Sequence, residues 1–264
     1  MLLDKFPQLK GLILDMDGVL WHDTEPIGDL KALFGEMDSL GLRYVFATNN
    51  ATKVAENYVS KLSGFGVEVN PNQIVTSAGT TLTYLQNQFP QGSKIFLVGS
   101  NSLGQLLASH GFEIVPEDSR QADAVIVGMD TNLTYQKIAN AGLIIRSGGA
   151  FIATNTDATY PTPSGLFPGA GAMVAAIQCA SGKDPFIIGK PYTSMYVQAL
   201  AQLGLSASET MGVGDRLETD IAGAQNAGML SGLVLSGVTR LAEAQAWKPA
   251  PNIIAKNLNA LIND

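Results

Sequence analysis

The stretch LILDMDGVLW, residues 12–21, places Asp15 and Asp17 directly after a run of aliphatic residues and just before Gly18. The aliphatic run predicts a buried strand, and side chains two positions apart along a strand point the same way. Two neighbouring carboxylates repel each other, and one is pushed towards its protonated form unless a cation lies between them. The stretch therefore predicts a strand whose carboxyl end needs a positively charged partner.

Similar aliphatic runs recur along the chain between amphipathic segments, which is typical of βα units around a parallel sheet. A helix is expected over residues 30–40, with Gly41 as its C-terminal stop, and another over about 52–62. The expected strands cover residues 11–15, 43–48, 94–98, 124–128, 151–154, 186–189, 210–214, 232–235 and 252–254. The chain is thus predicted to be an α/β protein with a Rossmann-like parallel sheet.

The middle of the chain begins a fresh strand–helix–strand unit after a polar link that contains glycine. We therefore expect residues 80–185 to form an inserted α/β domain, while residues 1–79 and 186–264 close into one discontinuous core domain. Within the insert, residues 160–171, YPTPSGLFPGAG, are expected to form a Pro/Gly-rich loop ahead of another helix.

Composition limits the classes of partner. The 264 residues carry a net charge of −7 with scattered Lys and Arg, so we expect no nucleic-acid partner and no membrane partner. No apolar run reaches the roughly 18–20 residues of a membrane span, and the N-terminal stretch lacks the pattern of a signal peptide. We expect a cytoplasmic location. Cys179, the one cysteine, excludes an intrachain disulfide and is expected to be buried.

Polar side chains follow four of the predicted strands. Thr48 and Asn49 come after the second strand, Lys190 follows the run FIIG, and Asp215 and Asp220 follow the run TMGVG. Ligands of open parallel sheets bind outside the carboxyl ends of the strands, so we expect these groups to converge with the first two aspartates. About four negative charges then face one lysine. An all-oxygen set of this kind suits Mg²⁺ bound together with a substrate phosphate.

Such a site suits phosphoryl transfer. One aspartate can attack phosphorus and form an aspartyl-phosphate, and a second can protonate the leaving alkoxide and later activate water. The metal and the lysine stabilise charge on the transferring group, and the hydroxyl of Thr48 can donate to its oxygens. The sequence therefore favours a Mg²⁺-dependent phosphatase that acts on a small-molecule phosphate monoester.

Four motifs in order, DMDGV, the Thr-Asn pair, GKP and GDRLETD, resemble those of the haloacid dehalogenase-like hydrolase superfamily. The stretches ATNNAT, ATNTDATYP and GLFPGAGAMVAAI are similar to its NagD-like, 4-nitrophenylphosphatase branch. The resemblance covers essentially the whole chain. It implies a phosphoric monoester hydrolase whose inserted unit is a cap that excludes water and reads the leaving group.

The resemblance also implies roles for individual residues. Asp15 would be the nucleophile, and Asp17 the acid and base, with the backbone carbonyl of Asp17 also touching the metal. Asp215 would be the third metal contact, while Asp220 would act through water or by orienting Lys190. The residues implied to bind substrate are Thr48 and Asn49 at the phosphoryl group and Asn155 and Asp157 in the cap.

Other interpretations remain open at this point. Asp220 could favour the first turn of a helix, and Asn155 and Asp157 could be turn residues. A dehalogenase of the superfamily would not need Asp17 as an acid, and a mutase would protect its phospho-enzyme from water. A signalling module or a ligand-binding relative without turnover is the alternative from another class. The assembly state is open, and a homodimer is one candidate.

Overall fold

The computed structural model describes residues 1–162 and 164–264, which divide into two compact units. The first unit comprises Met1–Thr48, Ala55–Val75 and Lys190–Asp264. The second comprises Asn49–Val54 and Thr76–Gly189. These bounds differ from the expected division at residues 80 and 185 chiefly by residues 49–54, which the sequence placed in the core domain.

A six-stranded sheet forms the centre of the first unit, with parallel pairing between β1 and each of its neighbours and between β13, β14 and β15. The strand order is β15 (Ile253–Ala255), β14 (Leu230–Val234), β13 (Thr210–Gly214), β1 (Gly11–Leu14), β4 (Arg43–Thr48) and β5 (Ile74–Thr76). Along β1, Leu12 and Leu14 belong to one apolar cluster and Ile13 to another. Because both faces are covered, the strand is apolar throughout, as parallel sheets require. The predicted α/β fold with a Rossmann-like sheet is confirmed.

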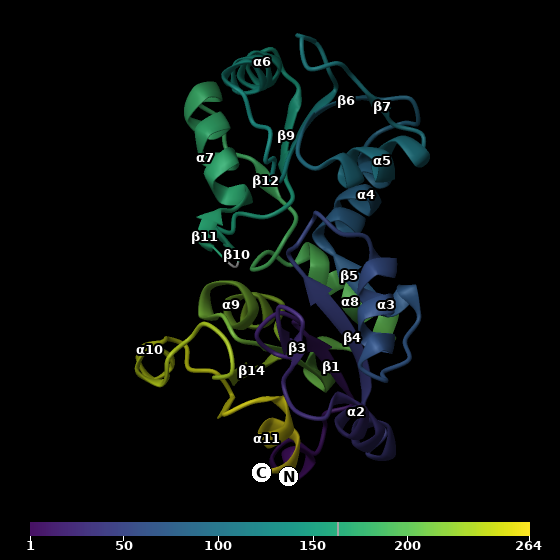
Figure 1. The fold of residues 1–264 in the computed structure, drawn as a ribbon, viewed down its shortest axis with the longest axis vertical. Helices are drawn as coiled ribbons and strands as arrows, with labels where there is room; N and C mark the ends of the chain where they lie inside the picture. The colour runs from purple at the N-terminus through teal and green to yellow at the C-terminus, as the bar shows by residue number, and fades with distance from the viewer. Residues whose placement is uncertain (163) are drawn as a thin grey trace. The chain divides into compact units, whose positions relative to one another are not determined.

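Helices and short turns surround this sheet. The α-helices are α1 (Leu2–Lys5), α2 (Leu30–Ser39), α3 (Ala55–Gly64), α8 (Ser194–Leu203), α9 (Ala222–Asn226), α10 (Leu241–Ala246) and α11 (Leu258–Asn263). Helix α2 begins where Asp29 accepts a hydrogen bond from the Ala32 amide and ends before Gly41, whose φ is +69°. Figure 1 shows the two chain ends beside each other, and the Lys5 ammonium donates to the Asp264 backbone carbonyl at 3.2 Å.

The second unit has its own parallel sheet. Its strand order is β12 (Phe186–Ile187), β9 (Ala150–Ala153), β8 (Ala124–Val127), β6 (Lys94–Val98) and β7 (Glu113–Ile114). The helices of this unit are α4 (Ser77–Gln88), α5 (Asn101–Ser109), α6 (Tyr135–Arg146) and α7 (Ala170–Ser181). Ile95 and Phe96 of β6 belong to different apolar clusters, so this sheet too is covered on both faces.

Two expectations for the second unit were wrong. The predicted loop at residues 160–171 contains an antiparallel hairpin of β10 (Thr159–Thr162) and β11 (Gly165–Pro168), followed by the start of α7. A two-stranded hairpin consists of edge strands, where proline is tolerated, so the Pro-rich composition was misleading. Cys179 is exposed, because α7 buries Val174, Ile177 and Ser181 on its other side.

A second hairpin, in the first unit, follows the Asp15–Asp17 stretch and pairs β2 (Trp21–His22) with β3 (Glu25–Pro26).

No helix among the described residues is long and apolar enough to cross a membrane.

Candidate active site

Three strands of the first unit end side by side at one edge of its sheet. The parallel register places the last residue of β1 opposite Phe46 of β4 and Val213 of β13. Asp15 follows β1, Thr48 ends β4, and Asp215 follows β13. Parallel strands direct their carboxyl ends to the same edge, so these residues share one end of the sheet.

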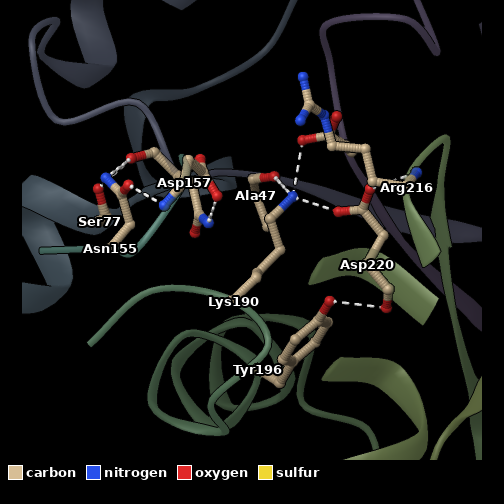
Figure 2. A network of polar contacts seen from close by, with 10 residues as sticks. Ala47, Ser77, Asn155, Asp157, Lys190, Tyr196, Arg216 and Asp220 are labelled. Carbon is tan, nitrogen blue, oxygen red and sulfur yellow. Dashed lines mark hydrogen bonds and ion pairs between the residues drawn. The ribbon is translucent and has the colours of Figure 1, made fainter. Parts of the chain in front are cut away.

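Lys190 is the cation at this edge, and its side chain is buried. Its ammonium donates to Asp220 Oδ1 at 2.6 Å and to the Ala47 carbonyl at 3.0 Å (Figure 2). It also donates to Asp15 Oδ1 at 2.7 Å. Burial alone would lower the pKa of Lys190, but the charges of Asp15 and Asp220 outweigh it and hold that pKa well above its usual value. The lysine is therefore a fixed positive charge between two carboxylates.

Asp220 is held from both its side chain and its backbone. It lies in the single π-helical turn Leu217–Ile221, where its Oδ2 accepts from the Arg216 amide at 3.1 Å, and the Tyr196 hydroxyl donates to its carbonyl at 3.0 Å (Figure 2). A Cβ at Gly214 would overlap the Asp220 side chain, so this turn requires glycine at the end of β13. Asp220 therefore both caps its own turn and pairs with Lys190.

Asp215 has one satisfied oxygen and one unsatisfied oxygen. Its Oδ2 accepts from the Val238 amide at 2.7 Å, whereas Oδ1 is buried and has no hydrogen-bond partner among the described residues. Gly18 and Gly237 leave no space for a Cβ against this carboxylate, and Gly18 has a φ of +81°. The two glycines let the backbone close around Asp215. A buried carboxylate oxygen without a donor calls for a cation.

Asp15, Asp215 and Asp220 each contribute one carboxylate oxygen to a cluster in which these atoms lie within 4.8 Å of one another. Burial, opposed by Lys190 and reinforced by Asp220 and Asp215, raises the pKa of Asp15 well above its usual value. Burial and Asp220 also raise the pKa of Asp215 to about 6. Three carboxylates thus exceed the one lysine, and the cluster gains from any added positive charge. Its all-oxygen donors fit a hard divalent cation.

Asp17 lies outside this cluster. Its side chain is exposed, and its Oδ1 accepts from the indole Nε1 of Trp21 at 2.8 Å. The contact with metal that the sequence assigned to Asp17 uses its backbone carbonyl, so the side-chain cluster does not test it. Thr48 is buried at the end of β4.

The three remaining predicted residues, Asn49, Asn155 and Asp157, lie in the second unit and bind one another. The Asn49 side-chain amide donates to Asp157 Oδ1 at 3.1 Å, and the Asn155 amide donates to the Asn49 carbonyl at 2.8 Å. The Asp157 amide in turn donates to Asn155 Oδ1 at 3.1 Å. Ser77 donates to the Asn49 carbonyl at 2.6 Å. These contacts order the loops that follow β4 and β9, and they are a local network of the second unit.

Several residues that contact the predicted site residues were not predicted from the sequence, among them Trp21, Tyr196 and Val238. Val238 follows β14, so the strand-end argument that found Asp215 would also have found this loop. Tyr196 has no comparable signal, because it lies on α8 and its hydroxyl reaches a backbone carbonyl. Trp21 follows Asp17 by four residues, but that spacing does not predict a hydrogen bond between the two side chains.

Comparison with known proteins agrees with this arrangement. Residues 12–113 match the family model described as haloacid dehalogenase-like hydrolase, and residues 187–261 match one described as HAD-hydrolase-like. An acid sugar phosphatase of Staphylococcus aureus is 35% identical over 255 residues, which are 97% of each chain.

Solved structures give the same result. NagD from E. coli K-12 has 31% identity and a TM-score of 0.85, with 95% of this chain and 97% of that chain covered. A glycerol phosphate phosphatase of Mycobacterium tuberculosis in complex with magnesium has 33% identity and a TM-score of 0.86, covering 97% of this chain and 77% of its own. The chain therefore belongs to the haloacid dehalogenase-like hydrolases, in their NagD-like branch.

Proposed function

We propose that this chain is a Mg²⁺-dependent phosphatase that hydrolyses small phosphate monoesters through an aspartyl-phosphate on Asp15. The observation that carries the proposal is the acidic cluster of Asp15, Asp215 and Asp220, in which Lys190 pairs with Asp15 and Asp220 while a buried oxygen of Asp215 has no donor among the described residues. The named relatives act on phosphate esters, which fits a cluster that needs a cation and a bound anion together.

In this proposal Asp15 attacks phosphorus, and the bond from phosphorus to the ester oxygen breaks. Asp17 gives its proton to the departing alkoxide, and as a carboxylate it then takes a proton from the water that hydrolyses the aspartyl-phosphate. Lys190 neutralises charge on the phosphoryl group and on Asp15, and Thr48 donates to a phosphoryl oxygen.

Asp15, Asp215 and Asp220, directly or through water, are the side chains that would hold Mg²⁺, with the Asp17 carbonyl as a fourth candidate contact. When bound, the ion screens the charge that the nucleophile and the phosphate would otherwise place next to each other. Because the cluster has three carboxylates and Lys190 supplies one positive charge, a divalent cation would offset the remaining negative charge.

Some predictions of the sequence stay predictions. The contacts of Asn49, Asn155 and Asp157 with substrate are among them, because their observed hydrogen bonds join them to one another. The same holds for the cytoplasmic location, the homodimer, and the absence of nucleic-acid and membrane partners.

Release of inorganic phosphate tests the proposal. The purified protein is incubated with each of several phosphate monoesters in the presence of Mg²⁺ or EDTA. The panel contains 4-nitrophenyl phosphate, glycerol phosphate, sugar phosphates, nucleotide monophosphates, phosphoglycolate and pyridoxal phosphate. We expect turnover with Mg²⁺, none with EDTA, and none in Asp15→Asn. Asp118→Asn is the matched control, since Asp118 is an exposed aspartate of the second unit.

A second measurement tests the covalent route. In the presence of an added alcohol, part of the phosphoryl group passes to that alcohol. If every ester forms the same aspartyl-phosphate, the ratio of phosphate to new ester is the same for all substrates. Ratios that change with the leaving group contradict the intermediate. No turnover of any ester by folded, Mg²⁺-loaded protein contradicts the phosphatase and favours a ligand-binding role.

A further inference from the structure

Trp21 is joined to the proposed acid and base by side chain and by backbone. Its indole Nε1 donates to Asp17 Oδ1 at 2.8 Å, and its carbonyl accepts from the Gly18 amide at 2.8 Å. The Trp21 side chain is fully buried, whereas Asp17 is exposed. An exposed carboxylate ordinarily samples several rotamers, and a hydrogen bond from a buried, immobile donor selects one of them.

The indole is itself held by residues of another segment. The Lys61 ammonium of α3 lies 3.9 Å from the centroid of the Trp21 ring and also donates to the Asp23 carbonyl at 2.6 Å. The Phe65 ring is tilted against the indole with centroids 5.9 Å apart. A cation over the ring face is attracted by the ring's negative face, so Lys61 fixes the indole and the β2–β3 turn together.

The two oxygens of Asp17 are not equivalent. Oδ1 takes the indole N–H, whereas Oδ2 makes no hydrogen bond with any of the described residues. A carboxylic acid that protonates a leaving group needs one oxygen for the proton and gains from having the other fixed. The indole therefore distinguishes the oxygen that can deliver a proton from the oxygen that is held.

We propose that Trp21 is a positioning residue for Asp17, held in place by Lys61, and that it directs Asp17 Oδ2 at the ester oxygen of the substrate. This inference rests on the proposed phosphatase activity. As Asp15 forms its bond to phosphorus, the electron pair of the breaking P–O bond goes to the ester oxygen, which takes the proton from Oδ2. Asp17 becomes a carboxylate whose charge the Trp21 N–H stabilises through Oδ1.

The test compares two leaving groups in Trp21→Phe, which keeps an aromatic ring and removes the N–H. An alkoxide such as that of glycerol needs a proton in order to leave, whereas 4-nitrophenolate leaves without one. For glycerol phosphate we expect kcat/KM to fall about 10- to 100-fold, a part of the effect of a general acid. For 4-nitrophenyl phosphate we expect a fall of less than about threefold, since its first step does not use the acid.

Trp247→Phe is the matched control, because Trp247 is the other tryptophan and lies in the same unit. Its Nε1 is buried and has no hydrogen-bond partner within the described part of the chain. We expect both substrates to keep their wild-type kcat/KM in this variant. Lys61→Met removes the cation over the indole and is expected to give the same selective loss as Trp21→Phe, with a smaller amplitude.

A spectroscopic arm is independent of turnover. In the Trp247→Phe background Trp21 is the only tryptophan, so its emission reports on the group that accepts its N–H. We expect Asp17→Ala, which removes the acceptor, to shift that emission and Asp118→Ala to leave it unchanged. Unchanged emission in Asp17→Ala overturns the inference.

Equal losses for the two esters in Trp21→Phe also overturn the inference, because a packing defect does not depend on the leaving group. If Trp21→Phe does not fold, Lys61→Met provides the test. A larger fall in kcat/KM for glycerol phosphate than for 4-nitrophenyl phosphate supports the inference, and equal falls overturn it. Wild-type protein that hydrolyses neither ester overturns the proposed function, and this inference with it. Wild-type turnover without selectivity in the variants overturns this inference alone.

Discussion

Two buried lysines of this chain each pair with two carboxylates, yet only one of them marks a candidate active site. Lys190 of the first unit contacts Asp15 and Asp220, and Lys137 of the second unit contacts Asp130 at 2.9 Å and Glu117 at 2.8 Å. Both lysines are almost completely buried, and for both the carboxylates raise the lysine pKa against the effect of burial.

The strand-end position does not separate the two sites. Asp130 follows β8 at the carboxyl edge of a parallel sheet, as Asp15 and Asp215 follow β1 and β13. The difference lies in the balance of charge. Asp130 Oδ1 accepts from the Asn132 amide at 2.8 Å and Oδ2 accepts from Lys137, while Glu117 is 66% exposed.

The first site instead has a third carboxylate, Asp215, with a buried oxygen that no described residue satisfies. Excess negative charge and a buried oxygen without a described partner distinguish a candidate cation site from an ion pair that holds a loop. A lysine beside a strand-end aspartate does not by itself indicate catalysis.

The largest expected contrast is in activity. Lys190→Met should lower kcat/KM for phosphate esters by about 10³-fold, the upper range for loss of one charge-stabilising group. Lys137→Met should leave kcat/KM unchanged, because Lys137 pairs with Asp130 and Glu117 of the second unit and not with the carboxylates of the candidate active site. Steady-state kinetics on 4-nitrophenyl phosphate with saturating Mg²⁺ measures both. A fall in kcat/KM of more than about tenfold in Lys137→Met would contradict the assignment of catalysis to the Lys190 site alone.

The reverse contrast concerns stability. Lys137→Met should lower the free energy of unfolding of the second unit by about 3 kcal/mol, because Asp130 stays buried without its counter-charge. The exposed Glu117 adds little. Urea unfolding followed by circular dichroism measures the change, and the double variant Lys137→Met/Asp130→Asn should recover part of it. Unchanged stability would mean that Asp130 is satisfied by its backbone donor alone.

The sequence predicts the long buried strands of both units well and the short or exposed strands poorly. The strands Arg43–Thr48, Lys94–Val98 and Thr210–Gly214 have their predicted bounds, because long aliphatic runs bounded by polar residues mark buried parallel strands. The β10–β11 hairpin and the three-residue β5 were missed. Strands that short, or that exposed, are stabilised by backbone pairing, which leaves no apolar period in the sequence.

For the site, the sequence predicts which residues reach the same sheet edge but not their partners. Asp15 and Lys190 are 175 positions apart, and the strand-end argument brings them together. The hydrogen bond from Trp21 to Asp17 depends on the path of a hairpin that no periodicity encodes. The hydrogen bond from the Asn49 side chain to Asp157 likewise depends on the paths of two loops, and the contact of Asn49 with a phosphoryl group stays a prediction.

The pH dependence of the metal-free protein offers a third contrast. Burial and Asp220 raise the pKa of Asp215 to about 6 from an ordinary value of 3.8. Between these two values the folded state binds more protons than the unfolded state, so stability falls as pH rises. The shift corresponds to about 3 kcal/mol, complete above pH 6. Urea midpoints in EDTA from pH 4 to 7 should fall for the wild type and fall less for Asp215→Asn. A flat wild-type profile would contradict the raised pKa.

Added Mg²⁺ should reverse that loss, and only at the first site. An ion that binds the folded state alone stabilises it by about 2.7 kcal/mol at one hundred times its Kd. Asp215→Asn should remove most of this gain, because the buried Oδ1 is the oxygen that has no other partner among the described residues. Asp130→Asn should keep the gain in full, although it too removes a strand-end carboxylate. Thermal unfolding of the three proteins with and without Mg²⁺ measures the difference. If Asp130→Asn lost the gain as Asp215→Asn does, the effect of Mg²⁺ would be one of general screening, and the charge balance would no longer distinguish the two lysine sites.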